Sequence, residues 1–327
     1  MKRMKALACC AAAACLAMVL AGCSSQQSYT PPEKSPTVSS PTISKAGTLR
    51  VGVNAGSPPL AGSPSSSSKI VGIDVDVAAA LADELGLKLE IVDVGTDPEA
   101  ALKESKVDIV MGVGSETDVS FWRSAAYLPK GVALFSTTSN TTVPTKASAP
   151  KIAAQVSSTS SWQVTNEFGE DALVAENDLK SAFSDLAAGT VQYVAADAII
   201  GMYAAHGGGY DAHIVALMQQ PGGYCVGVLD TNTELKQAVS AAVETLTGGG
   251  MVSVIEMKWL GAALDTSTLP LTAGASSTKS NGASTTTQQG NASATSSTTD
   301  GDEPAADEDE GDPASNAGQN AVQPQAA

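Results

Sequence analysis

The sequence is poor in the residues that build metal sites and disulfide frameworks. Its 327 residues include only two His and five Cys, and four of those Cys fall at or before position 23. Cys225 is therefore the only thiol in the rest of the chain, which excludes an internal disulfide there. Cys225 lies in an alternating, strand-like run, and this favours a buried structural cysteine over a nucleophile.

Basic residues are also few. The chain has 18 Lys and Arg against 34 Asp and Glu, a formal net charge of −16 and a sequence pI near 4.4. This balance argues against nucleic acid as a partner and against binding to anionic lipid headgroups. The sequence has no Ser/His/Asp order, zinc-ligand spacing or phosphate-binding loop, and its two histidines flank a Gly-rich turn. We therefore predict a protein without metal or cofactor that is not an enzyme.

The first apolar run, Ala6 to Ala21, is shorter than the roughly 20 residues that cross a bilayer. It follows a basic start and ends in small residues, a pattern that predicts an export signal over residues 1–22. The tetrad Leu20-Ala21-Gly22-Cys23 resembles the bacterial lipobox, which implies acylation of Cys23. Two acyl chains, each worth about 0.8 kcal/mol per buried CH₂, would anchor the protein on the extracytoplasmic face of the cell membrane.

Two segments lack any hydrophobic period. Residues 23–44 are rich in Ser, Pro, Gln and Thr and predict a flexible tether. The composition of residues 263–327 predicts a low-complexity tail, which includes an acidic cluster between Asp300 and Asp312. Such segments bury too little apolar surface to offset their ordering entropy, so we expect disorder. A solvated tail and a tail that binds cations or a basic partner both remain open.

The stretch between these segments alternates strand and helix signals. The predicted strands cover 48–53, 87–94, 107–111, 151–156 and 191–196, and the predicted helices cover 74–86, 97–105, 161–168, 177–188, 198–205, 233–246 and 250–260. This order is typical of mostly parallel sheets flanked by helices. Two further strand-like runs, 132–135 and 224–229, bracket the second set and are candidate crossings between two lobes.

The segment order over about Gly47 to Gly261 resembles the extracellular solute-binding proteins of family 3. The marks are the first strand Thr48–Val53, the run Gly72-Ile73-Asp74-Val75-Asp76, the strand Val107–Gly112, and the closing modules Tyr224–Val228 and Lys258–Gly261. The resemblance implies an α/β, two-lobed periplasmic-binding-protein-like fold of type II, in which two crossing strands join the lobes. Lobe 1 would contain residues 45–136 and 225–262, and lobe 2 residues 137–224.

The same resemblance implies a monomeric, non-catalytic receptor. It would capture a small polar solute, an amino acid or related amine, in the interlobe cleft and deliver it to an ABC transporter permease. Asp197 matches the acidic residue that receives the solute ammonium, and it could equally cap the following helix. Ser158 and Thr159 match hydroxyl and backbone donors for a carboxylate, or a plain cap. Gly114, Ser115 and Thr117 match similar donors on the opposite lobe.

Several departures from the family leave other functions open. Ser120 stands where relatives that bind α-amino acids carry a clamping Arg, so any guanidinium clamp must come from Arg123. Arg123 could instead be an exposed residue on a helix face. Leu60 and Ile73 replace the aromatic walls of relatives, and Trp122 or Trp162 could substitute for them or belong to the core. A sensory or protein-interaction lipoprotein with a decayed cleft is the main alternative, and a dehydratase-like enzyme on the same fold is a lesser one.

Overall fold

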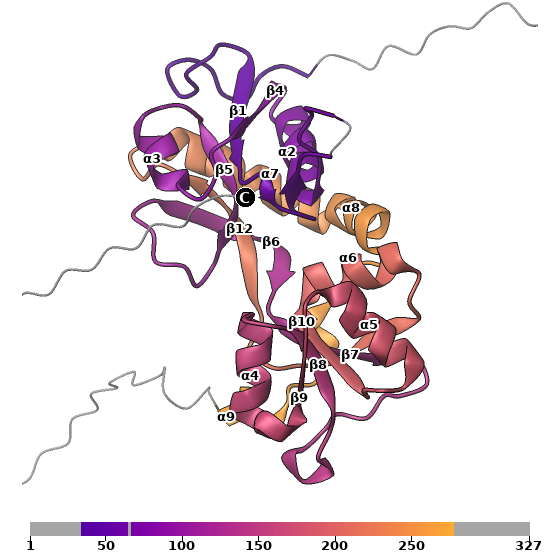
Figure 1. The fold of residues 1–327 in the computed structure, drawn as a ribbon. Helices are drawn as coiled ribbons and strands as arrows, with labels where there is room; N and C mark the ends of the chain where they lie inside the picture. Colours follow the sequence, from indigo (N-terminus) through magenta and orange to yellow (C-terminus); the bar gives the residue numbers. More distant parts are fainter. Residues whose placement is uncertain (1–33, 65–66, 278–327) are drawn as a thin grey trace, which may run out of the picture. The chain divides into compact units, whose positions relative to one another are not determined.

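The computed structural model describes residues 34–64 and 67–277 (Figure 1). The predicted signal peptide, the Cys23 lipid anchor, the first part of the tether and the acidic cluster lie outside the described residues. Among those that are described, no single helix is both long and apolar enough to cross a bilayer. Helices α7 (Thr233–Gly248) and α8 (Met251–Leu260), which are bent by 65° at the break between them, pass that test only as a pair.

The first sheet, which defines lobe 1, has the strand order β4-β1-β5-β12-β6. Its strands are β1 (Thr48–Val53), β4 (Lys88–Asp93), β5 (Ile109–Gly114), β6 (Trp122–Lys130) and β12 (Gly222–Val228). Strand β1 pairs with β4 and β5 in parallel, whereas β12 pairs with β5 and β6 antiparallel. A small hairpin, β2 (Gly56–Ser57) and β3 (Ala61–Gly62), adds to this lobe.

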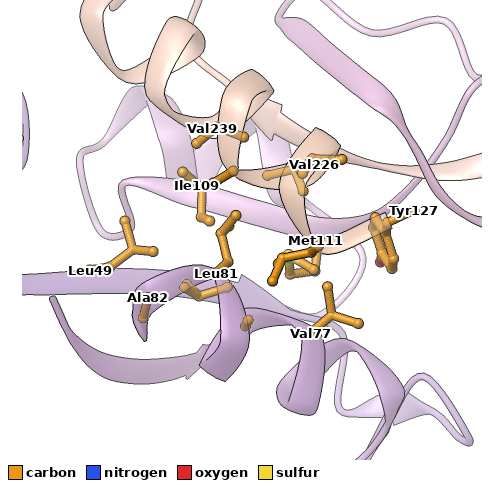
Figure 2. Packing of buried hydrophobic residues seen from close by; sticks show 14 of the residues in the cluster. Leu49, Val77, Leu81, Ala82, Ile109, Met111, Tyr127, Val226 and Val239 are labelled. Carbon is orange, nitrogen blue, oxygen red and sulfur yellow. The ribbon is translucent and has the colours of Figure 1, made fainter. Parts of the chain in front are cut away.

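Helices cover both faces of the first sheet (Figure 1). They are α2 (Ile73–Glu84), α3 (Pro98–Lys103), α7 (Thr233–Gly248) and α8 (Met251–Leu260). Side chains alternate along each strand, so Ile109 and Met111 face α2 and α7 in the main core, which Figure 2 shows from close by. Val110 points the other way, into a smaller cluster with Leu102 of α3. Val113 joins this cluster because Gly112, at φ 73°, and a register shift against β12 interrupt the alternation.

The second sheet, which defines lobe 2, has the order β11-β7-β10-β8-β9. Its strands are β7 (Val132–Thr137), β8 (Ile152–Gln155), β9 (Leu173–Glu176), β10 (Tyr193–Asp197) and β11 (Ala212–Leu217), and its helices are α4 (Thr159–Phe168), α5 (Leu179–Ala188) and α6 (Ala198–Gly208). Phe183 of α5 is fully buried between Phe135 and Tyr210, in the core on one face. Val164 and Phe168 of α4 fill the core on the other face.

The two-lobed α/β class predicted from the sequence is confirmed, with two details that differ. Each sheet has two parallel and two antiparallel pairings, so the sheets are mixed rather than mostly parallel. The chain crosses from β6 to β7 at Gly131, before the predicted boundary at residue 136, and returns between Leu217 and Gly222. The predicted crossing runs are thus strands within one lobe each, and the crossings are short segments beside them.

The predicted tether contains residues that pack in the core. Val38 and Ile43 are buried in the lobe 1 cluster, and the Thr37 amide donates to the Leu85 carbonyl at 3.0 Å. Two apolar residues set among Ser, Thr and Pro carry no periodic signal, so composition alone missed them. Residues 34–44 therefore belong to lobe 1.

A C-terminal strap, residues 263–277, follows α8 and includes the turn Thr266–Thr268 and the short helix α9 (Ala273–Ser277). Leu264 packs against the cores of both lobes, and Leu271 bridges Leu217 at the edge of the lobe 2 sheet. The Glu167 carboxylate of α4 accepts hydrogen bonds from Thr272 Oγ1 and the Gly274 amide, both at 2.8 Å. The predicted tail thus begins with an ordered third link between the lobes.

Glu167→Ala should loosen this strap, because it removes two acceptors from a partly buried site at a cost of about 1–2 kcal/mol. The Thr272 amide, which donates to the Leu217 carbonyl, should then exchange with deuterium about 10-fold faster. Glu170→Ala, at an exposed neighbouring carboxylate, is the matched control. Equal exchange in the two variants would show that Glu167 does not hold the strap.

A buried carboxyl lies beneath the lobe 1 sheet. Asp74, in the first turn of α2, accepts a 2.5 Å hydrogen bond from Tyr127 Oη, which itself accepts from the Gly112 amide at 2.9 Å. Burial raises the pKa of Asp74 from 3.8 to about 7, although the Tyr127 hydrogen bond opposes the shift. A folded-state pKa above the unfolded value means that this group's contribution to stability declines as the pH rises through that interval.

Asp74→Asn should therefore flatten the pH dependence of stability. Asparagine keeps an acceptor for Tyr127 and carries no charge to bury. The free energy of unfolding of the wild type, relative to the variant, should fall by about 1–2 kcal/mol between about pH 5 and about pH 7. Urea denaturation at both pH values measures this difference, and parallel pH profiles would contradict a raised pKa at Asp74.

Candidate functional site

A cavity of about 460 Å³ lies between the lobes. Lobe 2 supplies the carboxyl ends of β8 and β10 and the amino ends of α4 and α6, and lobe 1 supplies the end of β6 and the loop after β5. The residues that line it are Glu116, Lys130, Gly131, Val132, Gln155, Ser158, Thr159, Ser160, Leu179, Ala195, Ala196, Asp197, Ile200 and Gln219. The wall is thus mixed, with three charged side chains, several amide and hydroxyl groups, and an apolar remainder.

Asp197 is the last residue of β10 and the N-cap of α6. Its Oδ1 accepts from the amides of Ile199 at 3.0 Å and Ile200 at 3.2 Å. Burial raises the pKa of Asp197, while these two amide donors oppose the shift. The predicted cap is confirmed, and the same carboxylate faces the cavity. A partly desolvated carboxylate in such a cavity gains from a cation placed beside it.

The amino end of α4 also belongs to the lobe 2 wall. Ser158 is its N-cap, and Ser158 Oγ accepts from the Ser161 amide at 3.0 Å. Thr159 and Ser160 also line the cavity, and the amides of a first helical turn have no intrahelical acceptor. Ser157 precedes them with φ of 58°, a left-handed conformation that glycine adopts more readily. This end of the cavity therefore favours negative charge, as helix amino ends do.

Lobe 1 contributes an ion pair between Lys130, at the end of β6, and Glu116 in the loop after β5. Burial alone would raise the pKa of Glu116, but the hydrogen bond from Lys130 holds it below its usual value. Glycines make room for the pair. A Cβ at Gly114 would come within 2.8 Å of Lys130 Nζ, and one at Gly222 within 2.6 Å of Glu116 Oε2.

Comparison with known proteins agrees with this architecture. The family model for bacterial extracellular solute-binding proteins, family 3, matches residues 49–262, which is more than half of the chain. The chain belongs to this family. The family consists of solute receptors located outside the cytoplasmic membrane and is not a family of enzymes. Its members of the amino-acid ABC importer type are the structural neighbours of this chain.

Three solved structures have a similar fold. An ancestral cationic amino acid solute binding protein is 24% identical, with a TM-score of 0.55, and the match covers 65% of this chain and 96% of that one. The L-cystine solute receptor of Neisseria gonorrhoeae, in its unliganded open conformation, is 21% identical, with a TM-score of 0.56 and coverage of 66% and 93%. A polar amino acid ABC uptake transporter substrate binding protein from Streptococcus thermophilus is 18% identical, with a TM-score of 0.59 and coverage of 73% and 93%. No curated protein sequence matches this chain significantly. The solute of this family member therefore has to be inferred from its own cavity.

The structure brings some of the predicted site residues together and separates others. Asp197, Ser158 and Thr159 line the interlobe cavity. Gly114 and Thr117 line a different, smaller cavity of about 260 Å³ at the carboxyl ends of the lobe 1 strands. Ser115 fastens the loop to β12, since its Oγ accepts from the Gly223 amide at 2.9 Å and its amide donates to the Gly223 carbonyl at 2.8 Å.

Arg123 lies in strand β6, so the prediction that it sits on a helix face is wrong. Its Nη1 donates to the carbonyls of Gly114, at 2.9 Å, and Thr117. The guanidinium thus fastens the loop after β5 and does not line the interlobe cavity. Strand β6 was not predicted from hydrophobic periodicity. Its pairing with β12 contains two register shifts, which interrupt the alternation of buried and exposed residues.

Glu116, Lys130, Gln155 and Gln219 line the cavity but were not among the predicted site residues. Each lies at the end of a strand or in a loop, where hydrophobic periodicity gives no signal. The sequence offers one clue to Lys130, which directly precedes a glycine and a new apolar strand. Gln219 has no signal of this kind. In the structure its side-chain oxygen accepts a 2.6 Å hydrogen bond from Gln163 Nε2.

Among the described residues that line this cavity, none has an aromatic or sulfur-containing side chain. Trp162 is 66% exposed on α4, so the prediction of a core residue is wrong for it, whereas Trp122 packs partly buried against the lobe 1 core. Neither tryptophan lines the cavity. Cys225 is buried in β12, as predicted for a structural cysteine. Within residues 34–64 and 67–277, no three His, Cys, Asp or Glu side chains gather as a metal site would require.

Proposed function

We propose that this protein captures a small polar solute, an amino acid or a related amine, in the interlobe cavity and delivers it to an ABC transporter permease. The observation that carries the proposal is the Asp197 carboxylate facing the same cavity as the amino end of α4. One group favours an ammonium and the other a carboxylate, and the cavity that they share has a volume that suits a small molecule. The names of the structural neighbours, which bind cationic or polar amino acids or L-cystine, support the same solute class.

The two lobes give such a receptor its mechanism. Each lobe offers part of the polar wall, so a solute held by one lobe gains its remaining contacts only when the second lobe closes over it. The short crossings at Gly131 and between Leu217 and Gly222 are the natural hinge. A lipid on Cys23 would keep the receptor beside its permease, with residues between Cys23 and lobe 1 as the tether.

A sensory or interaction protein with a decayed cleft is the second candidate. It is favoured by the hydrogen bonds of Arg123 to loop carbonyls and by the absence of an aromatic side chain among the described residues of the cavity wall. A dehydratase-like enzyme has weaker support, since no histidine is found in the part of the wall that the structure describes and two acidic residues alone do not form a tuned acid and base pair.

Differential scanning fluorimetry separates these candidates. The full chain is heated with each L-amino acid, small amines and short peptides in turn. A receptor shows a saturable rise in melting temperature with one chemical class, because a ligand that binds only the folded state stabilises it. No shift with any member of the panel would contradict solute capture and favour the decayed cleft.

A further inference from the structure

The charged groups of the interlobe cavity are unequal in number. Asp197 and Glu116 are acidic, and Lys130 is the one cationic side chain among the described residues that line it. An α-amino acid brings one ammonium and one carboxylate into this space. The two acidic side chains can compensate the ammonium. The amino end of α4 offers the carboxylate hydrogen-bond donors and a partial positive charge, and a fully charged partner has to come from another group.

Lys130 is placed to be that partner. It is the last residue of β6, directly before the crossing at Gly131. Its ammonium pairs with Glu116, lies 5.8 Å from the centroid of the Tyr224 ring, and acts electrostatically on Asp197. The side chain is 31% exposed and lines the cavity, so it is accessible to a solute there.

Arg123, the other candidate for binding the carboxylate, does not belong to this wall. Arg123 donates through Nη1 to two loop carbonyls, and it does not line the cavity. Gly114 and Gly222 leave space for the Lys130 and Glu116 side chains, because a Cβ at either position would collide with the pair.

We propose that Lys130 determines solute specificity by binding the carboxylate of a zwitterionic solute, with Glu116 holding the ammonium of Lys130 at the cavity wall. The solute class is then free amino acids, and amines without a carboxylate are poor ligands. This inference rests on the proposed function and adds to it the group that reads the carboxylate. A lysine ammonium is a compact point charge, so it tolerates more than one carboxylate orientation, unlike a bidentate guanidinium.

An alternative role for Lys130 predicts the opposite change in affinity. If the Lys130 ammonium occupied the place of the solute ammonium beside Asp197 and Glu116, it would compete with the ligand. Removing its charge would then strengthen the binding of amines. The sign of the change in affinity therefore distinguishes a carboxylate partner from a plug.

Isothermal titration calorimetry on the full chain provides the test, with each proteinogenic L-amino acid compared with its carboxamide. The wild type should prefer the free acid by about 10-fold, and Lys130→Met should remove that preference by weakening the free acid alone. Lys130→Arg should restore most of it. Lys151→Met, an exposed lysine outside the cavity, is the matched control and should behave as the wild type.

The outcomes are distinct. Binding with an unchanged preference in Lys130→Met would overturn the role of Lys130 and leave the proposed function intact. Tighter carboxamide or amine binding in Lys130→Met would overturn it in favour of the plug. Absence of binding by the wild type across the panel would overturn the proposed function and this inference together. If Lys130→Met fails to fold by circular dichroism, Lys130→Gln answers the same question with a polar side chain.

Discussion

Asp197→Asn should weaken solute binding by roughly 10- to 150-fold, which corresponds to about 1.5–3 kcal/mol for a lost charged hydrogen bond. The asparagine keeps a side-chain oxygen that can cap α6 through the amides of Ile199 and Ile200. It removes the negative charge that the cavity presents to an ammonium. Calorimetric titration with the best ligand of the panel measures the change.

A second capping aspartate provides the control. Asp178 is the N-cap of α5, accepts from the Ser181 amide at 2.7 Å, and does not line the cavity. Asp178→Asn should therefore leave the affinity unchanged. If Asp197→Asn is also unchanged, Asp197 is a helix cap and does not bind the solute.

The pH dependence of binding follows from the same residue. Burial raises the pKa of Asp197, and a protonated carboxyl no longer attracts an ammonium. The affinity of the wild type should thus fall on acidification through this raised pKa, and that of Asp197→Asn should change less.

Asp108→Ala should destabilise lobe 1 by about 3–5 kcal/mol, the cost of removing one partner of a buried ion pair. The Asp108 side chain is 2% exposed and Arg50 is 15% exposed. Asp108 accepts from Arg50 Nη2 at 2.9 Å and from the amides of Ser44 at 3.0 Å and Arg50 at 2.9 Å. The substitution leaves a shielded guanidinium and two amides without these acceptors.

Guanidinium chloride denaturation measures this loss, with Glu99→Gln as the control. Glu99 pairs with Lys103 on the surface of α3, and such exposed pairs contribute at most about 1 kcal/mol. Burial alone would raise the pKa of Asp108, but Arg50 and the amides hold it below its usual value. Its contribution to stability is therefore present at neutral pH and is lost as the pH falls through the lowered pKa. Equal stability of Asp108→Ala and wild type would contradict this role.

The fold could be read from the sequence wherever side-chain period and capping residues agree. Helix α5 begins at its Asp178 cap and ends at Gly189 in the left-handed conformation, both of which are local signals. Val38, Ile43 and Leu271 carry no such signal, because isolated apolar residues among polar neighbours become core only when distant strands and helices cover them. The sequence therefore did not predict that residues 34–44 and 263–277 are ordered.

The site residues likewise fall into those that the sequence predicted and those that only the folded structure brings together. Asp197, Ser158 and Thr159 were predicted from the resemblance to the family, at the end of a strand and the start of a helix, and they line one cavity. Lys130 and Glu116 come from separate segments that meet only after β6 and β5 join through β12. Arg123 was available by composition, but its hydrogen bonds to loop carbonyls are a tertiary feature. The sequence thus predicted part of the lobe 2 wall, and it did not predict the lobe 1 wall.

Native mass spectrometry of the full chain, purified gently from cells and sprayed without denaturation, tests the central claim most directly. A receptor that traps a small polar solute between its lobes should carry one bound molecule of amino-acid size. That molecule should be released on denaturation and be absent from Asp197→Asn purified in the same way. Wild-type protein that carries no such molecule and gains none when mixed with the amino-acid panel would contradict the claim.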